Sequence, residues 1–301
     1  MNGPDAIGFA GLGQMGGPMA GNIAAAGLSP VVYDKAGTAD RAPAGSVAAE
    51  SFEDLVRRCD TLFLSLPDGT YCLEAARALI QCQERRPTVV FDLSTIGPPA
   101  AREIDRVLGE NGIIYVDAPV SGGAAGANAG TITVMCAGPL GEFERHREIL
   151  GAFSKNRFHV GDTPGQGQAL KILNNFLSAT AMAATSEAVL FGLSQGLDMK
   201  TLLDVVNVST GQNSATLDKF PNRILPGTFD AGFKTALLAK DVRLYLENAK
   251  AAGTPDRVGS VVSETWNDCD TTLPGSDFTH IYSFIEADIE ECIDGSNEGG
   301  G

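Results

Sequence analysis

The chain has 301 residues, 44% hydrophobic and 20% charged, which is typical of a globular protein with room for two domains. Its 22 basic and 37 acidic side chains give a net charge of −15, so neither nucleic acid nor an anionic membrane is expected as a partner. No apolar run of membrane-spanning length and no amino-terminal signal segment is found, which favours a cytoplasmic protein. The six cysteines show no paired spacing and should be reduced, and the three histidines lie near no ligand cluster, so no metal site is expected.

The first informative segment is "AIGFAGLGQMGGPMAGNIAAAGLSPVVYD", in which a strand, a glycine turn, a helix and a second strand follow one another. The strand is expected at 7–10 and the helix at about 17–26. In the GxGxxG turn, Gly11 permits a tight bend, Gly13 admits a pyrophosphate and Gly16 lets helix and strand pack closely. The turn is therefore predicted to bind a dinucleotide through Gly11, Leu12, Gly13, Gln14, Met15 and Gly16.

Asp34 follows the second strand of this segment. A carboxylate there can hydrogen-bond both hydroxyls of an adenine ribose and repels a 2′-phosphate, which favours NAD as the cofactor. Lys35 comes directly after it and could tolerate a 2′-phosphate, so NADP stays possible. The alternative that the glycines form only a structural turn is weakened by the strand before them, the helix after them and the position of Asp34.

Three further apolar segments, "TLFLSLP", "TVVFDLS" and "IIYVDAPV", alternate with helical ones and predict a parallel sheet covered on both faces. Ligands of such sheets bind at the carboxyl ends of the strands, so Leu66 and Pro67 are predicted cofactor contacts. Thr95 follows the next strand. It is either a ligand contact or a cap of the helix that begins near Pro98.

Ser121, Gly122 and Gly123 belong to the glycine-rich segment "DAPVSGGAAGANAGTITVMCAG". With no bulky side chains in the way, their backbone N–H groups can form a concave nest for an anion such as a carboxylate. The alternative is a flexible linker, which is less favoured because strand-forming residues follow at once.

The segment from Gln168 to Gln195 predicts one long apolar helix. Lys171, Asn174 and Asn175 are spaced by three and four residues and so share a face of it. Beyond Lys171 the only charged residue before Gly196 is Glu187, which indicates a helix buried on most sides. For Asn174, ligand contact and helix packing are both open.

Five segments in order, "GLGQMGGPMAGN", "DLSTIGP", "DAPVSGGAAGANAGT", "LKILNN" and "LLAKD", resemble the β-hydroxyacid dehydrogenase family, which includes 3-hydroxyisobutyrate dehydrogenase and tartronate semialdehyde reductase. The resemblance implies an α/β Rossmann-type doubly wound parallel sheet, then a long interdomain helix and an all-α C-terminal domain. The domains are expected at 1–164 (dinucleotide binding) and 165–294 (helical, for substrate and oligomerisation), with the interdomain helix at about 168–195 and a disordered tail at 295–301.

The resemblance also implies roles for single residues. Lys171 would be the catalytic acid/base and Asn175 would orient the reacting group, while Ser121, Gly122 and Gly123 hold the substrate carboxylate. Thr95 and Lys240 would lie beside the nicotinamide, and Lys240 near the substrate as well. The predicted contacts also include Asn174 for the substrate and Phe233 for the cofactor, where core filling is the alternative; the roles of Asp241 and His280 stay open.

The predicted function is NAD-dependent hydride transfer between a small 3-hydroxycarboxylate and its semialdehyde or 3-oxo acid. For Lys171 to act as the base, its pKa, about 10.4 in a free side chain, has to fall through partial burial. The alternatives are an imine reductase on the same fold, against which Lys171 argues because those enzymes lack this lysine, and a catalytically silent dinucleotide-binding protein. The long apolar helix favours a homodimer or homotetramer.

Overall fold

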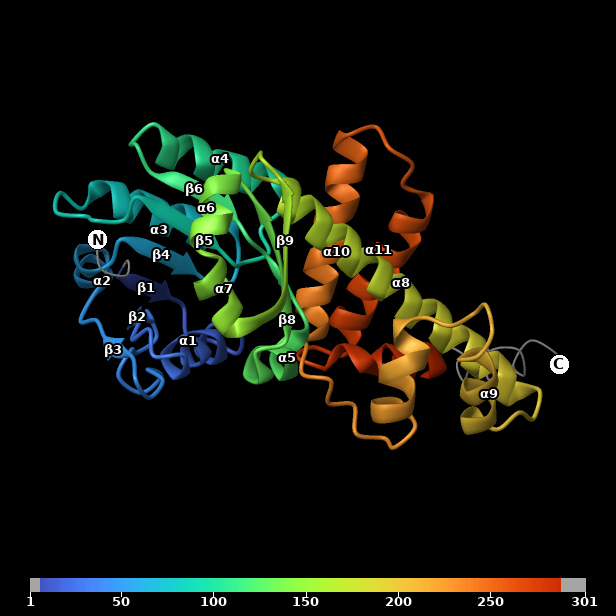
Figure 1. Cartoon of the computed structure of the whole chain (residues 1–301). Helices are drawn as coiled ribbons and strands as arrows, with labels where there is room; N and C mark the ends of the chain where they lie inside the picture. The colour runs from blue at the N-terminus through green and yellow to red at the C-terminus, as the bar shows by residue number, and fades with distance from the viewer. Residues whose placement is uncertain (1–5, 288–301) are drawn as a thin grey trace. The chain divides into compact units, whose positions relative to one another are not determined.

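The computed structural model of the chain describes residues 6–287 (Figure 1). It divides into two compact units, Met1–Lys171 and Ile172–Gly301. The tail predicted at 295–301 and Cys292 lie outside the described residues.

A sheet of nine strands forms the centre of the described part of the first unit, in the order β3-β2-β1-β4-β5-β6-β8-β7 with β9 beside β8. The strands β1 to β6 pair in parallel, and β8 is antiparallel to β6 and β7 but parallel to β9. This is the Rossmann order with an extension at one edge, so the expected doubly wound parallel sheet is confirmed. The strands are β1 Ile7–Ala10, β2 Val31–Tyr33, β3 Val47–Ala48, β4 Thr61–Leu64, β5 Val89–Asp92, β6 Ile114–Asp117, β7 Val120–Ser121, β8 Ile132–Ala137 and β9 Ser154–Gly161.

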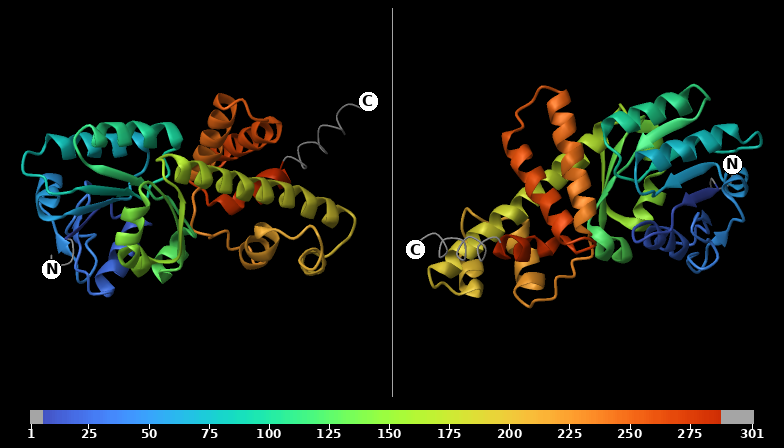
Figure 2. Two further views of the ribbon diagram at one scale, coloured as in Figure 1. Left: turned by 45° about the horizontal axis from the view of Figure 1, so that its top comes forward. Right: turned by 180° about the vertical axis from the view of Figure 1, so that it is seen from behind.

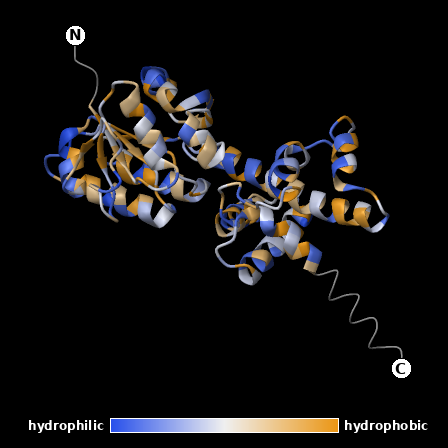
Figure 3. Cartoon of the chain, turned by 90° about the horizontal axis from the view of Figure 1, so that it is seen from below, coloured by the Kyte–Doolittle hydropathy of each residue, from blue (hydrophilic) through white to orange (hydrophobic). Residues whose placement is uncertain are grey.

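Helices cover both faces of this sheet (Figure 1). One face packs against α1 (Gly16–Ala25), α5 (Gly123–Ala129), α6 (Leu140–Arg145) and α7 (Arg147–Phe153). The other packs against α2 (Phe52–Arg58), α3 (Gly69–Gln81) and α4 (Pro98–Gly109). Strands β1, β4 and β5 are buried along their whole length and are mostly apolar, with Thr61 at the start of β4 and Asp92 at the end of β5. Figure 3 shows these hydrophobic strands between the helices.

The second unit is helical in its described part, where the only β-type pairing is an isolated bridge between Lys234 and Asp277. Helix α8 (Gln166–Ser194) begins in the first unit and continues into the second. It is followed by α9 (Met199–Val206), the π-helix η1 (Ala215–Ile224), α10 (Thr235–Ala251), α11 (Arg257–Thr272) and the 3-10 turn η2 (Phe278–His280), after which a helix runs on to residue 287. Figure 2 shows α10 and α11 side by side, and the core of the unit surrounds Trp266.

The π-helix and β9 are two elements that the sequence pattern did not predict. Pro221 lies inside the π-helix, and proline is a signal against a helix interior, so this segment did not show a helical pattern. In β9 the residues are mostly half-buried or exposed, so no apolar strand pattern marks it. Both elements depend on tertiary packing more than on local preference.

Helix α8 corrects the expectation that the chain has no apolar run of membrane-spanning length. It has 29 residues and is long and apolar enough to cross a membrane by length and composition, the one such helix among the described residues. In this structure 44% of its most apolar window is buried inside the protein. The core helix of a soluble protein passes the same test, and the buried Ala179 and Met182 belong to the core of the second unit.

Candidate active site

Four parallel strands end level with one another at the carboxyl edge of the sheet. Ala10 of β1 is paired with Leu64 of β4, Leu64 with Asp92 of β5, and Asp92 with Asp117 of β6. The segments that follow these strands therefore leave the same edge, which is where ligands of parallel sheets bind. They are residues 11–16, 65–68, 93–97 and 118–123, and they hold most of the predicted cofactor and substrate contacts.

The glycine turn between β1 and α1 has the geometry that a dinucleotide requires. Gly11 has φ 95°, and a Cβ there would lie 2.2 Å from the Ser65 carbonyl oxygen. A Cβ at Gly16 would lie 1.9 Å from the Gly11 carbonyl oxygen, whereas a Cβ at Gly13 would meet no atom within 4 Å. The first and third glycines are thus required by backbone packing, and the second leaves open space against which a pyrophosphate can lie.

The carboxylate of Asp34 is hydrogen-bonded to this turn. Its Oδ2 accepts the Leu12 N–H at 2.7 Å and its Oδ1 accepts the Ala36 N–H at 2.8 Å. The Arg41 Nε lies 3.9 Å from Oδ1, and the Lys35 ammonium lies 5.9 Å from the centre of the Tyr71 ring. Asp34 therefore shapes the turn, and its remaining lone pairs can still accept from the hydroxyls of a ribose.

Leu66 and Pro67 follow β4 at the same edge. Leu66 is half-buried and Pro67 is exposed. The Leu66 N–H donates to the Ser94 hydroxyl at 2.8 Å, which joins the segment after β4 to the segment after β5.

The side chain of Gln168 forms hydrogen bonds with the segment that carries Thr95. The sequence pattern did not indicate this role of Gln168. Its Oε1 accepts the N–H groups of Ile96 at 2.9 Å and Gly97 at 3.2 Å, and its Nε2 donates to the Ser94 carbonyl at 2.9 Å. The Gln168 side chain is fully buried, and its partners stand on both sides of Thr95. The residue at the cap position of α4 is Gly97, two residues after Thr95.

Asp117 at the end of β6 caps the start of α8 and was also missed. Its Oδ1 accepts the Gly165 N–H at 2.9 Å, and its Oδ2 accepts the Gln168 N–H at 2.8 Å. These N–H groups precede or begin the helix, where no intrahelical partner exists. Burial raises the pKa of Asp117 to about 7, although the two hydrogen bonds favour the ionised form. The carboxyl edge of the sheet thus fixes where the helix of Lys171 begins.

Asp117 should make the stability of the first unit depend on pH. Its folded pKa of about 7 lies above the ordinary value of about 3.9. Between these values the folded state holds more protons, so this group's contribution to the free energy of unfolding falls as pH rises. The free energy of unfolding of wild type minus that of Asp117→Asn, measured in urea, should therefore fall by up to about 4 kcal/mol from pH 4 to pH 7. It should stay constant from pH 8 to 9. A difference that is flat below pH 7 would contradict the assignment.

The Ser121–Gly123 segment links β7 to α5. Gly122 has φ 134° and Gly123 has φ 64°, both in the region that L side chains rarely adopt. A Cβ at Gly122 would also lie 3.0 Å from a methyl group of Ile132. The segment is therefore a shaped turn, which excludes the flexible-linker alternative, and its backbone is accessible because Gly122 is exposed.

Lys171 and Asn175 are buried, 8% and 6% exposed, and lie one turn apart on α8. The Asn175 Nδ2 donates to the Asp241 carboxylate at 2.6 Å, and the Lys240 Nζ lies 3.3 Å from the other oxygen of that carboxylate. Asn174 is half-buried and its Nδ2 donates to the Asn175 Oδ1 at 3.3 Å. In the second unit, the predicted Asn174, Asn175 and Lys240 therefore belong to one polar group.

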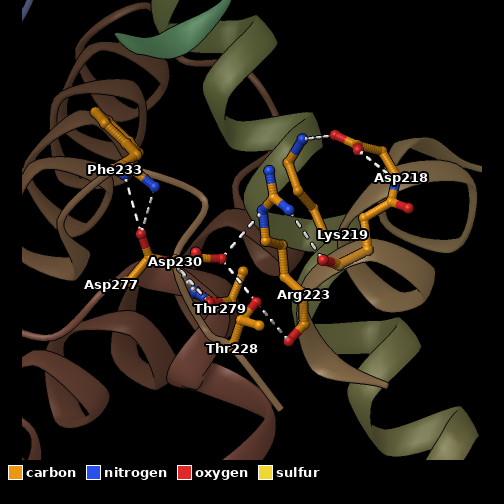
Figure 4. Close-up of polar contacts among 10 residues, drawn as sticks. Asp218, Lys219, Arg223, Thr228, Asp230, Phe233, Asp277 and Thr279 are labelled. Atoms are coloured by element: carbon orange, nitrogen blue, oxygen red, sulfur yellow. Dashed lines mark hydrogen bonds and ion pairs between the residues drawn. The ribbon is translucent and has the colours of Figure 1, made fainter. Parts of the chain in front are cut away.

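Phe233 lies at the end of a loop that Asp277 organises (Figure 4). The Asp277 Oδ2 accepts the N–H groups of Gly232 at 2.7 Å and Phe233 at 3.1 Å, and its Oδ1 accepts the Thr279 hydroxyl at 2.6 Å. The Phe233 ring packs edge-on against Phe278 at 6.0 Å between ring centres. It is half-buried against the core of the second unit, so it does fill core space.

Two further contacts complete this loop. Asp230 pairs with Arg223 at 3.3 Å and accepts the Thr228 hydroxyl at 2.7 Å (Figure 4). The His280 ring stacks on Phe229 with 4.6 Å between ring centres, which is a structural contact of this histidine.

The cysteines of the described residues are free and buried, in agreement with the reduced, scattered thiols that their spacing indicated. They are Cys59, Cys72, Cys82, Cys136 and Cys269. Between residues 6 and 287, no group of three or more His, Cys, Asp or Glu side chains could hold a metal ion.

The strand order, the glycine turn and the carboxylate at the end of β2 define a Rossmann-type oxidoreductase that uses a nicotinamide dinucleotide. Two family models match the chain: the NAD binding domain of 6-phosphogluconate dehydrogenase over residues 6–161, and the NAD-binding domain of NADP-dependent 3-hydroxyisobutyrate dehydrogenase over residues 165–285. The chain belongs to the 3-hydroxyisobutyrate dehydrogenase family of β-hydroxyacid dehydrogenases.

Curated relatives cover most of the chain. The 2-(hydroxymethyl)glutarate dehydrogenase of Eubacterium barkeri is 37% identical over 83% of this chain and 84% of its own length. The mitochondrial 3-hydroxyisobutyrate dehydrogenase of Rattus norvegicus is 32% identical over 93% and 86%. The NAD-dependent L-serine dehydrogenase of Pseudomonas aeruginosa is 36% identical over 85% and 89%.

Solved structures show the same fold. The 3-hydroxyisobutyrate dehydrogenase of Mycobacterium tuberculosis with L-serine has a TM-score of 0.86 at 30% identity, covering 93% of this chain and 99% of its own. Psf3 in complex with NADP+ and 2-OPP has a TM-score of 0.79 at 27% identity over 93% and 100%. An imine reductase of Streptomyces aurantiacus, at a TM-score of 0.62 and 20% identity over 93% and 99%, shares the fold alone.

Proposed function

We propose that this protein interconverts a small 3-hydroxycarboxylate and its semialdehyde or 3-oxo acid, with Lys171 as the general acid/base. The observation that carries the proposal is the carboxyl edge of the sheet, which brings together the glycine turn, the Thr95 segment, the Ser121–Gly123 turn and the start of the helix of Lys171. The named activities of the relatives, on 2-(hydroxymethyl)glutarate, 3-hydroxyisobutyrate and L-serine, support the same substrate class.

The chemistry divides between the cofactor and the side chains of this chain. When bound, NAD accepts a hydride from the carbon that bears the hydroxyl group. Neutral Lys171 removes the hydroxyl proton, and its protonated form returns that proton to the carbonyl oxygen in the reverse reaction. Asn175, one turn further on α8, orients the hydroxyl or the lysine amine. Lys240 and Thr95 are assigned to the nicotinamide side.

The substrate carboxylate is assigned to the Ser121–Gly123 turn. Positive φ values at two successive glycines turn the backbone N–H groups to positions that a chain with side chains rarely reaches. Backbone donors bind a carboxylate without adding a positive charge to the site. Asn174 is assigned to packing and to its bond with Asn175, with a substrate contact as the alternative.

NAD is the proposed preferred cofactor, and NADP is tolerated. The Asp34 carboxylate lies against the turn through its Oδ2, so a 2′-phosphate there would meet a negative charge. Lys35 follows Asp34 in the chain and the Arg41 Nε lies 3.9 Å from its carboxylate, so these two cations support tolerance of a 2′-phosphate. Phe233 is assigned to the cofactor in addition to its place in the core.

The test is NAD reduction at 340 nm with 3-hydroxyisobutyrate, 2-(hydroxymethyl)glutarate, glycerate, L-serine and, as a control for carbon skeleton, the 2-hydroxyacid lactate. We expect turnover of at least one 3-hydroxyacid and none of lactate. Turnover of lactate alone, or none of the panel despite NAD binding, would overturn the proposal. A cyclic imine with NADPH belongs in the same panel, because its reduction would favour the imine reductase alternative.

We infer two domains, at 1–164 and 165–294. The family models, which end at residue 161 and begin at 165, support the boundary, while the compact units divide after Lys171 within α8. The relative from Rattus norvegicus is mitochondrial by name, whereas the relative from Eubacterium barkeri is bacterial. For this chain the cytoplasm is the proposed compartment.

A homodimer or homotetramer is proposed from the apolar residues that the second unit exposes. On α8, Leu177 is 60% and Phe191 67% exposed, and on α11, Val258 and Val261 are exposed beside the groove between the two helices. Light scattering after size exclusion should give a mass of two or four chains. The double variant Leu177→Glu and Phe191→Glu should lower that mass, and a wild-type monomer at micromolar concentration would refute the proposal.

A further inference from the structure

The carboxylate of Asp241 ties together two residues of the proposed site. It accepts the Asn175 Nδ2–H at 2.6 Å through Oδ2, and its Oδ1 lies 3.3 Å from the Lys240 ammonium. Asp241 is 3% exposed and Asn175 6% exposed, while Lys240 is half-buried. Hydrogen bonds to a charged acceptor are stronger than neutral ones, and burial removes competing water, so this contact holds Asn175 firmly.

The contact fixes which way the Asn175 amide faces. An ionised carboxylate has acceptors and no donor, so only the NH2 end of the amide can face Asp241. The Asn175 Oδ1 then faces away from Asp241 and is the acceptor end, which receives the Asn174 Nδ2–H at 3.3 Å. A protonated lysine needs a hydrogen-bond acceptor, whereas an NH2 group in the same place would repel it.

We propose that Asp241 is a positioning residue for catalysis: it orients the Asn175 amide so that its carbonyl oxygen accepts a hydrogen bond from the Lys171 amine. The inference rests on the proposed function of Lys171 and Asn175. Asp241 acts through Asn175 and touches no reacting atom. Asp241 also forms an ion pair with Lys240, the residue before it on α10. The same buried carboxylate thus contacts both Asn175 and Lys240.

The kinetic test compares Asp241→Asn with wild type. An asparagine at 241 can donate or accept, so the Asn175 amide loses its fixed orientation, and kcat should fall about 100-fold with KM for the acid within a few-fold of wild type. In an Asn175→Ala background the same change should lower kcat by much less than in wild type, because only the contact with Lys240 is left to lose. Equal losses in both backgrounds would overturn the proposal. Glu247→Gln removes an exposed negative charge from the same helix and should leave kcat unchanged.

A second measurement runs without any substrate. In 15N-labelled protein, the side-chain NH2 signals of Asn175 are identified by their loss in Asn175→Ala. They should shift in Asp241→Asn and stay in place in Glu247→Gln. Unchanged signals in Asp241→Asn would sink the positioning role even if that variant is slow. Absence of any turnover by wild type would instead overturn the proposed function, and the NH2 signals would still decide whether Asp241 orients the amide.

Discussion

Replacing Lys171 with methionine should lower kcat for the 3-hydroxyacid by about 10³-fold or more, while the affinity for NAD stays within a few-fold of wild type. General acid/base groups contribute about 10²- to 10⁴-fold, and the loss should fall on the chemical step. Methionine is chosen because Lys171 is 8% exposed, and an unbranched apolar side chain fills the space of its stem. Steady-state kinetics at 340 nm and NAD titration by fluorescence measure the two quantities.

Lys171→Arg separates acid/base chemistry from charge. An arginine keeps the positive charge but cannot be deprotonated in a protein, so the oxidation should be lost as in Lys171→Met. Lys200 is an exposed lysine of α9 that forms an ion pair with the exposed Asp204, so Lys200→Met is the matched control and should keep full activity. An active Lys171→Arg would show that charge alone suffices, and turnover that survives in Lys171→Met would refute the lysine mechanism.

Replacement by alanine should lower the free energy of unfolding at Gly16 and leave it nearly unchanged at Gly13. In Gly16→Ala the new Cβ would lie 1.9 Å from the Gly11 carbonyl oxygen, a backbone atom that cannot move aside without displacing β1 or α1. Overpacking of this kind costs about 3 kcal/mol, and urea unfolding should show it as a lower free energy of unfolding. In Gly13→Ala no atom lies within 4 Å of the new Cβ, so stability should change by less than about 0.5 kcal/mol.

NAD binding should respond to the change at Gly13, where stability does not. The open space at Gly13 is where we place the pyrophosphate, so Gly13→Ala should weaken NAD binding by about 10-fold or more although the protein is fully folded. Isothermal titration at a temperature where both variants are folded measures it. Unchanged NAD affinity in Gly13→Ala would place the pyrophosphate elsewhere, and equal stability of the two variants would refute the packing argument for Gly16.

Local patterns in the sequence were enough for the Rossmann strands, the glycine turn, the carboxylate at Asp34 and the long helix of Lys171. Each of these rests on neighbours: glycines two to five residues apart, an apolar run that ends in a polar residue, and helical spacing between Lys171 and Asn175. The roles assigned to Lys171, Asn175 and Ser121–Gly123 came from the family resemblance, and they stay proposals that the kinetic experiments test.

The partners of the buried polar groups were decided by tertiary structure alone. Gln168 reaches the Thr95 segment across 72 residues of chain, Asp117 caps α8 across 51, and Asp241 holds Asn175 across 66. A buried glutamine or aspartate carries no sign in the sequence of which backbone or amide group it will meet, because its hydrogen bonds form only when distant elements pack. The sequence by itself therefore determined the family, the cofactor turn and the helix of Lys171, and the fold decided what holds that helix and its amide in place.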